Sequence, residues 1–499
     1  MINQKRYLAQ IVIEADSPLK IGSGDKDLFL DSPIQKDWNG LPMILGTSIT
    51  GVLRHSFNLN PATENGSYEN DKSKDDKSFL NQLFGYQDKN NDKGLGSRLI
   101  VSNAHLLDED MRVNEGLLLE KSSFLKAFDN LPVREHTAIT DKGVAKEHSK
   151  FDEEVIFKGT RFKFEIELIG DTLNKDDENI TIEEHEENDN KYKNNWEEII
   201  NKLNSPIFRL GGGTTKGFGK IKVISIQEKV YDLSKDEDIK AYQNKSASLN
   251  VGVGASAYPE MKGAKGYSRY NLKITPDDFF LFGSGFADDE ADMTPVKEDV
   301  ILWDNNKGKF SKQQILMPAT SIKGALSHRT AFYYNKLVGN FADKVENKND
   351  YIMENNKAVS EIFGIAKDSP KENFNRSLEH NKKYLKLDKV SGAKGKILIS
   401  DMFKVLGKNQ EKVFDHVKID RFTGGAMDGA LFQEKVVAQK DEWDIEILLK
   451  KDEINDENVI KAFELALRDI TTGMLPLGGS VMKGHGVFEG KLYKNGVEI

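Results

Sequence analysis

Apolar and polar residues alternate along several short stretches of the chain, which predicts β-strands with one buried face. These stretches are IVIEADSPLKI from Ile11, RLIVSNAHL from Arg98, FKFEIELI from Phe162, LKITPDDFFLF from Leu272, KILISDMFKV from Lys396 and WDIEILLK from Trp443. Between them, apolar residues recur at helical spacing over Trp196–Leu203 and Val459–Ile470. Two Thr-Ser pairs predict further helix starts, because a hydroxyl oxygen can cap free N–H groups; they are Thr47 with Ser48 and Thr320 with Ser321.

The same pattern occurs twice along the chain. IVIEADSPLKIGSG in the first half matches LKITPDDFFLFGSG in the second, and LGTSITGVLRH matches PATSIKGALSH. In the same order follow QLFG with EIFG, the stretch from His136 to Phe151 with that from His416 to Phe432, and LGGGTTKGFG with LGGSVMKGHG. Five matches in one order indicate a duplication.

Each copy therefore reads as strand, helix, strands, helix, strand, which predicts an α+β, ferredoxin-like fold with insertions. We expect a first domain over 1–227, a linker over 228–267 and a second domain over 268–499. The charged stretches Asn65–Ser78 and Asn174–Lys193 are typical of solvated insertions.

Composition narrows the function. A chain of 499 residues is long enough for two domains. Its formal net charge of −9 argues against coating nucleic acid by charge alone but allows a local basic groove. The absence of cysteine excludes thiolate nucleophiles and Cys-based zinc sites, and it fits a cytoplasmic protein. The sequence has no apolar run of about 18 residues, so we expect no membrane span.

The two late glycine-rich loops are the most specific local feature. Both follow the pattern LGG, three residues, then KGxG, which lacks the spacing of a P-loop. Glycine allows close approach of a backbone and lysine adds charge, so these loops suit a phosphodiester backbone. The alternative is a tight turn between helix and strand. The candidate RNA contacts here are Gly211, Gly212, Lys216 and Gly217 in the first copy and Gly478, Gly479, Lys483 and Gly484 in the second.

Other candidate RNA contacts lie in the early turns, at the helix starts and on matched histidines. A helix start can bind an anion through its free N–H groups, although plain capping explains it equally well. The histidines could transfer protons, but packing roles near bound RNA explain them better. The candidates are Gly22, Ser23, Gly24, Gly283 and Ser284 in the turns; Thr47, Ser48, Arg54, Thr320, Ser321 and Lys323 at the helix starts; and His136 and His416.

One acidic residue occupies the same place in each copy. Asp31 follows Gly22 by nine residues, and Asp292 follows Gly283 by nine. A lone Asp near a proline is usually a turn former. In RNA cleavage such a carboxylate could orient the ribose 2′-OH, act as a general base, or help to hold a divalent cation.

Taken together, IGSGDKDLFLDSPIQKD, LPMILGTSITGVLRH, LFG and LGGGTTKGFGKI resemble the RAMP superfamily of CRISPR-associated proteins, especially the backbone subunits of type III interference complexes. The resemblance implies a ferredoxin-like, RRM-related fold and a filament of subunits along guide RNA. It also implies a thumb-like hairpin in each copy, at about 134–157 and 414–438. The second copy departs from the family pattern because Met293 separates Asp292 from the Thr-Pro pair.

The resemblance further implies that Asp31, and with less support Asp292, cuts paired target RNA with a divalent cation such as Mg²⁺ or Mn²⁺. The implied partners are guide RNA, single-stranded target RNA and other type III effector subunits. Three alternatives stay open at this point. They are a guide-RNA-binding subunit that does not cut, a metal-independent guide-processing endonuclease using His485, and an unrelated ferredoxin-like binding protein.

Overall fold

We describe a computed structural model of the chain, covering residues 2–24, 32–57, 79–87, 94–140, 142–172, 182–257, 263–311, 313–346, 351–365 and 392–499. The expected insertion at 65–78 and the catalytic candidate Asp31 lie outside these described residues. No helix in the described part is long and apolar enough to cross a membrane.

The first copy is built on an antiparallel sheet of seven strands. Its long first strand is central, with the last core strand on one side and the strand after the hairpin on the other. The strands are β1 (Ile2–Ala15), β2 (Met43–Ile44), β5 (Leu99–Val101), β6 (Ala104–Leu106), β9 (Arg161–Thr172), β10 (Ile221–Asp232) and β11 (Ala255–Ala257). The helices are α1 (Gly46–Phe57), α2 (Phe79–Phe84), α3 (Ser123–Lys126), η1 (Ala127–Asp129), α4 (Ile182–Leu203) and α5 (Asp236–Gln243), and β3 (Tyr86–Gln87) pairs with β4 (Gly94–Leu95).

The second copy repeats this arrangement on a five-stranded sheet and a three-stranded one. The first sheet contains β12 (Tyr267–Pro276), β19 (Ile397–Ile399), β23 (Trp443–Lys450), β24 (Phe488–Lys494) and β25 (Val497–Glu498), and the second contains β13 (Lys297–Glu298), β16 (Gln314–Met317) and β20 (Met402–Val405). The helices are α6 (Ala319–Val338), η3 (Met353–Asn355), α7 (Lys357–Phe363), η4 (Lys451–Glu453), α9 (Glu457–Thr471) and η5 (Val481–Lys483), and β17 (Gly364–Ile365) pairs with β18 (Ala393–Lys394).

The core strands of both copies follow one order, which is the fourth, first, third and second in chain order. The predicted ferredoxin-like fold is thus confirmed. The helices expected from apolar spacing are present as α4 and α9. Each buries its apolar stripe against its own sheet, with Trp196 and Ile199 in the first copy and Phe463 and Leu467 in the second.

Backbone hydrogen bonds between equivalent residues of the two copies confirm the duplication. Ser23 N donates to Pro33 O, and Ser284 N donates to Thr294 O. The late loops dock on the early turns in the same way, through Gly212 N to Lys20 O and Gly479 N to Leu281 O. These bonds identify equivalent positions in the two copies.

The predicted helix caps are wrong. Helix α1 begins at Gly46 and α6 at Ala319, so both Thr-Ser pairs already lie inside a helix. The oxygen that accepts from the first helical N–H comes from a distant residue. Asn103 Oδ1 accepts from Gly46 N at 2.9 Å, and Asp401 Oδ1 accepts from Ala319 N at 2.8 Å.

The segment 228–267, expected as a linker, contributes structure to the first copy. It contains the end of β10, helix α5 and strand β11, which pairs with β10. Tyr242 of α5 packs edge-on against Tyr231 of β10, with ring centroids 5.3 Å apart.

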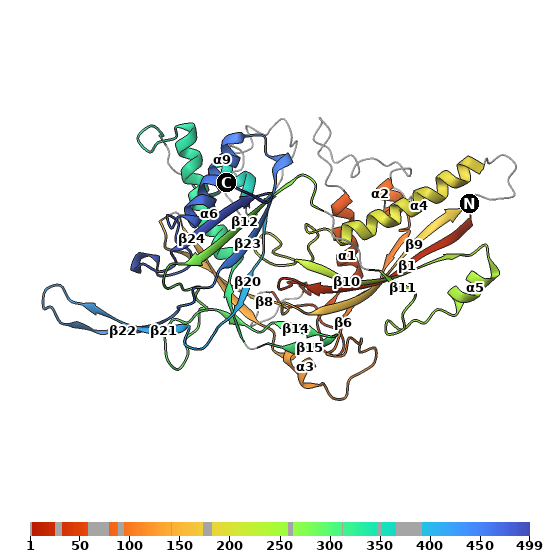
Figure 1. Cartoon of the computed structure of the whole chain (residues 1–499), viewed down its shortest axis with the longest axis horizontal. Helices are drawn as coiled ribbons and strands as arrows, with labels where there is room; N and C mark the ends of the chain where they lie inside the picture. Colours follow the sequence, from red (N-terminus) through yellow and green to blue (C-terminus); the bar gives the residue numbers. More distant parts are fainter. Residues whose placement is uncertain are drawn as a thin grey trace.

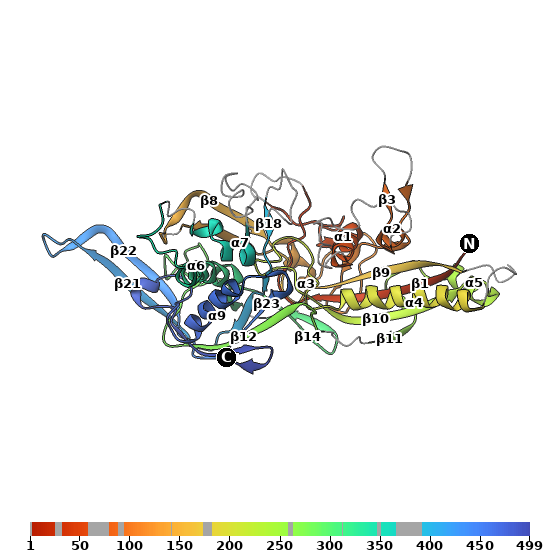
Figure 2. The same cartoon turned by 90° about the horizontal axis from the view of Figure 1, so that it is seen from above.

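Three of the two-stranded hairpins in the described residues decide how the copies meet. The thumb-like hairpin β7 (Val133–Ile139) to β8 (Ala145–Glu154) belongs to the first copy and reaches the second, whereas β21 (Glu411–Ile419) to β22 (Ala426–Val437) projects away from both (Figures 1 and 2). A smaller hairpin of the second copy, β14 (Ile301–Asp304) to β15 (Lys307–Phe310), returns to the first. The two copies therefore exchange hairpins where they meet.

Candidate nucleic-acid interface

The glycines of the late loops have an internal structural role. Gly211 has a φ of 82°, and a Cβ there would lie 2.3 Å from Lys20 O. Gly478 has a φ of 95°, and its Cβ would lie 2.4 Å from Leu281 O. These residues, with Gly212 and Gly479, seat each loop on the early turn of its own copy and so fix the position of the following lysine.

The loop of the first copy lies against the helix start of the second copy. Gly217 has a φ of 113°, and a Cβ there would lie 2.4 Å from Asp401 Oδ1 and 2.9 Å from Ala319 Cβ. Lys323 on α6 donates to Thr215 Oγ1 at 3.4 Å. The structure thus brings together Lys216 and Lys323, two predicted contacts from different copies.

These two lysines form a cationic cluster at the junction. Burial, with a further contribution from the charge of Lys216, lowers the pKa of Lys323 to about 8. Two cations held this close repel each other unless an anion lies between them. An RNA phosphate would supply that anion, and Thr320 and Ser321 lie on the same first turn of α6.

The base of each hairpin carries a matched group of ring, carboxylate and lysine. His136 stacks on Phe151, with centroids 5.1 Å apart, and Lys216 Nζ lies 5.1 Å from the same ring. His136 Nε2 is 3.3 Å from a carboxylate oxygen of Glu153, which also bonds to Lys20. Burial alone would raise the pKa of Glu153, but His136 and Lys20 outweigh it and lower it to about 2.

The second copy repeats the group with one exchange. His416 stacks on Phe432 at 4.9 Å, and its Nε2 lies 3.1 Å from Glu434. Lys483 lies over the Phe432 ring and bonds directly to Glu434. Leu281 stands where the first copy has Lys20. In the second copy it is therefore Lys483 that pairs with Glu434, whereas in the first copy Lys20 pairs with Glu153. Lys216 is thereby left to face the junction.

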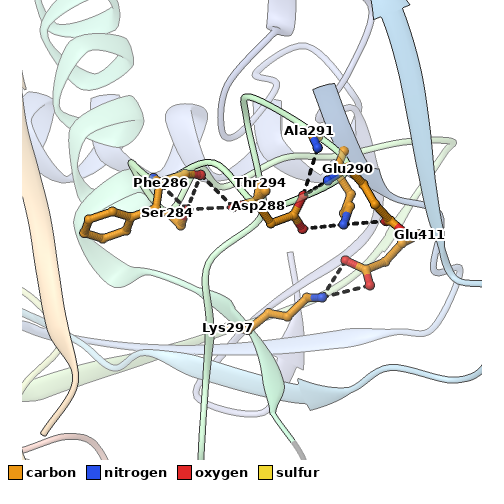
Figure 3. A network of polar contacts seen from close by, with 9 residues as sticks. Ser284, Phe286, Asp288, Glu290, Ala291, Thr294, Lys297 and Glu411 are labelled. Carbon is orange, nitrogen blue, oxygen red and sulfur yellow. Dashed lines mark hydrogen bonds and ion pairs between the residues drawn. The ribbon is translucent and has the colours of Figure 1, made fainter. Parts of the chain in front are cut away.

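Asp292 lies on an exposed loop that is tied to the second hairpin. Its Oδ2 accepts from Gln433 N at 2.8 Å. The loop is further held by Asp288, which accepts from the N–H groups of Glu290 and Ala291 (Figure 3). The Asp288 carboxylate also pairs with Lys435. The hydrogen bond with Lys435 has the largest effect, and together these bonds lower the pKa of the Asp288 carboxyl to about 2.

The early turns are closed by cross-strand bridges. Gly22 bridges to Ile34 and Gly283 to Pro295. Ser284 Oγ lies 2.8 Å from Thr294 Oγ1 (Figure 3). Gly24, at the end of the first turn, has a φ of 83°, and no atom of the described residues lies within 4 Å of a Cβ built there.

The start of helix α1 in the first copy carries different side chains from the start of α6 in the second. Arg54 Nη1 donates to Gly85 O at 3.0 Å, so its guanidinium holds a neighbouring loop. Thr47 is exposed and Ser48 half-buried. Thr50 stands where the second copy has Lys323, and its hydroxyl donates to Gly46 O. This end of the chain therefore lacks the helix lysine found at the junction.

Sequence reasoning missed the groups that organise the interface. Arg134 and Glu153 lie in the first hairpin, and Glu298 and Asp401 receive Arg134 in the second copy. One signal was available, because a glutamate follows the matched phenylalanine by two residues in both hairpins. Within the described residues, no cluster of three His, Cys, Asp or Glu side chains could hold a metal ion.

Comparison with known families agrees with this geometry. The family model of the RAMP superfamily matches residues 12–222 and again residues 281–489, which together make up most of the chain. No curated protein matches the chain. The chain belongs to the RAMP superfamily of CRISPR-associated RNA-binding proteins and carries two fused copies of its domain.

Proposed function

We propose that the chain is a backbone subunit of a type III CRISPR RNA-guided complex. In this proposal it binds guide RNA across the junction of its two copies. It also acts as an endoribonuclease that cleaves the paired target RNA, with Asp31 in the first copy and Asp292 in the second.

The composite cationic cluster carries the proposal. Lys216 comes from a loop of one copy and Lys323 from a helix of the next, so a phosphate between them would be bound by two successive RAMP domains at once. Lysines and helix N–H groups recognise the backbone rather than the base sequence. A guide-RNA subunit needs this property, because each guide differs in sequence.

The hairpin bases offer a second kind of contact. The His136–Phe151 and His416–Phe432 pairs present stacked rings beside a lysine. Unstacked RNA bases bind to such aromatic faces without regard to sequence. One such group per copy suits a protein that contacts RNA at a regular interval.

The position of Asp292 supports cleavage in the second copy. One carboxylate oxygen is fixed by Gln433 N, which leaves Oδ1 for the 2′-OH of a bound ribose or for a cation. Mg²⁺ is commonly held by one or two carboxylates together with phosphate oxygens, so a single aspartate fits such an ion only when RNA is bound. A divalent cation would there stabilise charge on the phosphate.

Mapping the products of bound target RNA tests this proposal. We expect two cuts in the wild type, one lost in Asp31→Ala and the other in Asp292→Ala. Asp289→Ala is the matched control, because Asp289 is an exposed acid of the same loop. If both cuts persist in both variants while RNA stays bound, the aspartates have no catalytic role.

A subunit that binds guide RNA without cutting is the second candidate. The bond from Gln433 N to Asp292 favours it, because that bond gives the carboxylate a structural role. In that case no target products form, and Asp292→Ala instead loosens the base of the second hairpin. A guide-processing enzyme is less favoured, because His485 is buried against Phe279 and Phe414 and its equivalent is Phe218. Cleavage in EDTA would support that alternative.

A further inference from the structure

The two copies meet through an ion pair that is buried in the interior. The guanidinium of Arg134, on the first hairpin, bonds to both carboxylate oxygens of Glu298 and to Asp401 of the second copy. It also lies 5.1 Å from the ring of Phe218. Burial alone would lower the pKa of Arg134, but Asp401 and Glu298 raise it above its ordinary value.

In the free hairpin, β21–β22, which projects away from both copies, an aromatic residue stands in the place of Arg134. Phe414 stands opposite Glu434 as Arg134 stands opposite Glu153. It stacks on His485, which occupies the place of Phe218, with centroids 5.9 Å apart. The end of the second copy therefore presents a ring where the internal junction presents a cation.

A second set of contacts joins the two copies, in which the β14–β15 hairpin of the second copy fits an aromatic pocket of the first. Phe310 of β15 packs against Phe124 and Phe157 of the first copy, at 5.2 and 5.0 Å between centroids. Trp303 Nε1 donates to Gly159 O at 2.7 Å.

Within the described residues, neither part recurs at the two open ends, which are the face of the first copy that carries Asn103 and the side of the second copy that carries the β21–β22 hairpin. In the first copy the β14–β15 connection is replaced by a short turn whose Trp38 is 95% exposed. In the second copy the segment that includes Phe124 is replaced by the short connection 406–410. A second copy of this chain, added head to tail, would find neither the hairpin nor the pocket.

The late loop at the open end is also without a neighbour. Gly484 has a positive φ of 89°, as its equivalent Gly217 has one of 113°, yet no atom of the described residues lies within 4 Å of a Cβ built at Gly484. At Gly217 the second copy fills that space. The backbone of the open end thus keeps a shape that receives another domain.

The exposed residues on the outer face of the free hairpin indicate what kind of surface a domain that docks there must have. On the first hairpin this face carries Glu135, whose carboxylate lies against Gly285 of the second copy, while Arg134 reaches Glu298 and Asp401 from the opposite face. Farther out it carries Thr137 and Lys150, a cross-strand pair. The equivalent pair on the free hairpin is Val417 and Leu431, which are 49% and 63% exposed.

The receiving face of the first copy does not match this hairpin. Asn103 stands where the second copy has Asp401, and both bond to a helix start in the same way. Asp37 stands in the place of Glu298, and its Oδ1 accepts from Asn39 N and Leu41 N. Docking Phe414 there would bury a carboxylate without a cation, which is strongly unfavourable.

We propose that the β21–β22 hairpin docks on a RAMP-type domain of a different chain, through an apolar surface that receives Val417 and Leu431, and not on a second copy of this chain. This inference rests on the proposed function, because it treats the chain as one part of a longer assembly. The open ends thereby fix the order in which different RAMP chains assemble.

Photo-crosslinking tests the proposal in the full chain, isolated from the cells that naturally make it. With benzoyl-phenylalanine at Leu431, we expect a crosslink to a different chain whose sequence matches the RAMP family. The same probe at Lys150 is the matched control, and it should react within the chain. A crosslink from Leu431 to a second copy of this chain, to a protein of another fold, or to no protein would overturn the proposal.

A paired variant gives an independent measurement. Val417→Thr with Leu431→Lys copies the first hairpin and leaves the internal junction unchanged. We expect the co-purified partner to fall about tenfold or more, because apolar burial is lost, while bound RNA is retained. Equal recovery of the partner would overturn the inference. If the purified wild-type chain carries its partner but no RNA, that result overturns the proposed function alone.

Sedimentation of the isolated chain completes the test. We expect one species across the full range of concentration that the protein tolerates. A ladder of head-to-tail oligomers would contradict the claim that the open ends do not recognise each other.

Discussion

Replacing Arg134 with methionine should destabilise the contact between the two copies more than most single substitutions. The side chains of Arg134, Glu298 and Asp401 are almost fully buried, at 6%, 5% and 0% exposure. Methionine keeps much of the volume of arginine but removes the charge. Two carboxylates then remain in the interior without their cation.

The expected loss follows from that burial. Breaking a buried ion pair from one side costs about 3–5 kcal/mol, because the remaining charge stays out of water. Asp401 keeps its bond from Ala319 N, which offsets part of the cost. We therefore expect a loss of about 3–4 kcal/mol in the free energy of unfolding.

Urea unfolding of the full chain measures this loss. Arg112→Met is the control, because Arg112 is exposed, and it should change stability by about 0.5 kcal/mol or less. Adding Glu298→Gln and Asp401→Asn to Arg134→Met should recover most of the loss, since no buried charge then remains. A loss below about 1 kcal/mol would refute the argument.

Three further predictions concern the junction. Gly217→Ala should lower stability by about 1–3 kcal/mol more than Gly484→Ala in thermal unfolding, because both have positive φ but only Gly217 abuts Asp401; equal losses would contradict this. Lys216→Ala should reduce the slope of log affinity against log salt for RNA by about 1, and an unchanged slope would remove Lys216 from the interface. RNA affinity should fall as pH rises through about 8, the pKa of Lys323 in the free protein, because RNA binds its protonated form. Lys323→Arg should abolish that fall, and a fall that persists would point to another group.

The sequence predicted the elements of the fold well, because each copy has a regular apolar pattern. The alternation at Ile11 and Leu272 and the helical spacing at Trp196 and Phe463 come from burial on one face, which is a local property. The helix caps were mispredicted because the accepting oxygens of Asn103 and Asp401 lie far away in the chain.

The candidate site was only partly predictable. Repetition identified Lys216, His136 and His416, since duplicated residues are visible in one sequence. It could not identify Arg134, whose partners Glu298 and Asp401 come from the other copy and have no repeated equivalent pair. It also could not show that Lys216 and Lys323 meet, because that contact depends on how the copies pack. The place of Asp31 stays a prediction.

The most direct test of the account is the RNA that the full chain carries when it is purified from its natural cells. We predict RNA of uniform length, which is retained by the control Lys491→Ala, a change at an exposed lysine of β24. Lys216→Ala combined with Lys323→Ala should lose most of that RNA without loss of fold. A wild-type chain that carries no RNA, or a double variant that carries as much as the control, would contradict the claim that the junction binds guide RNA.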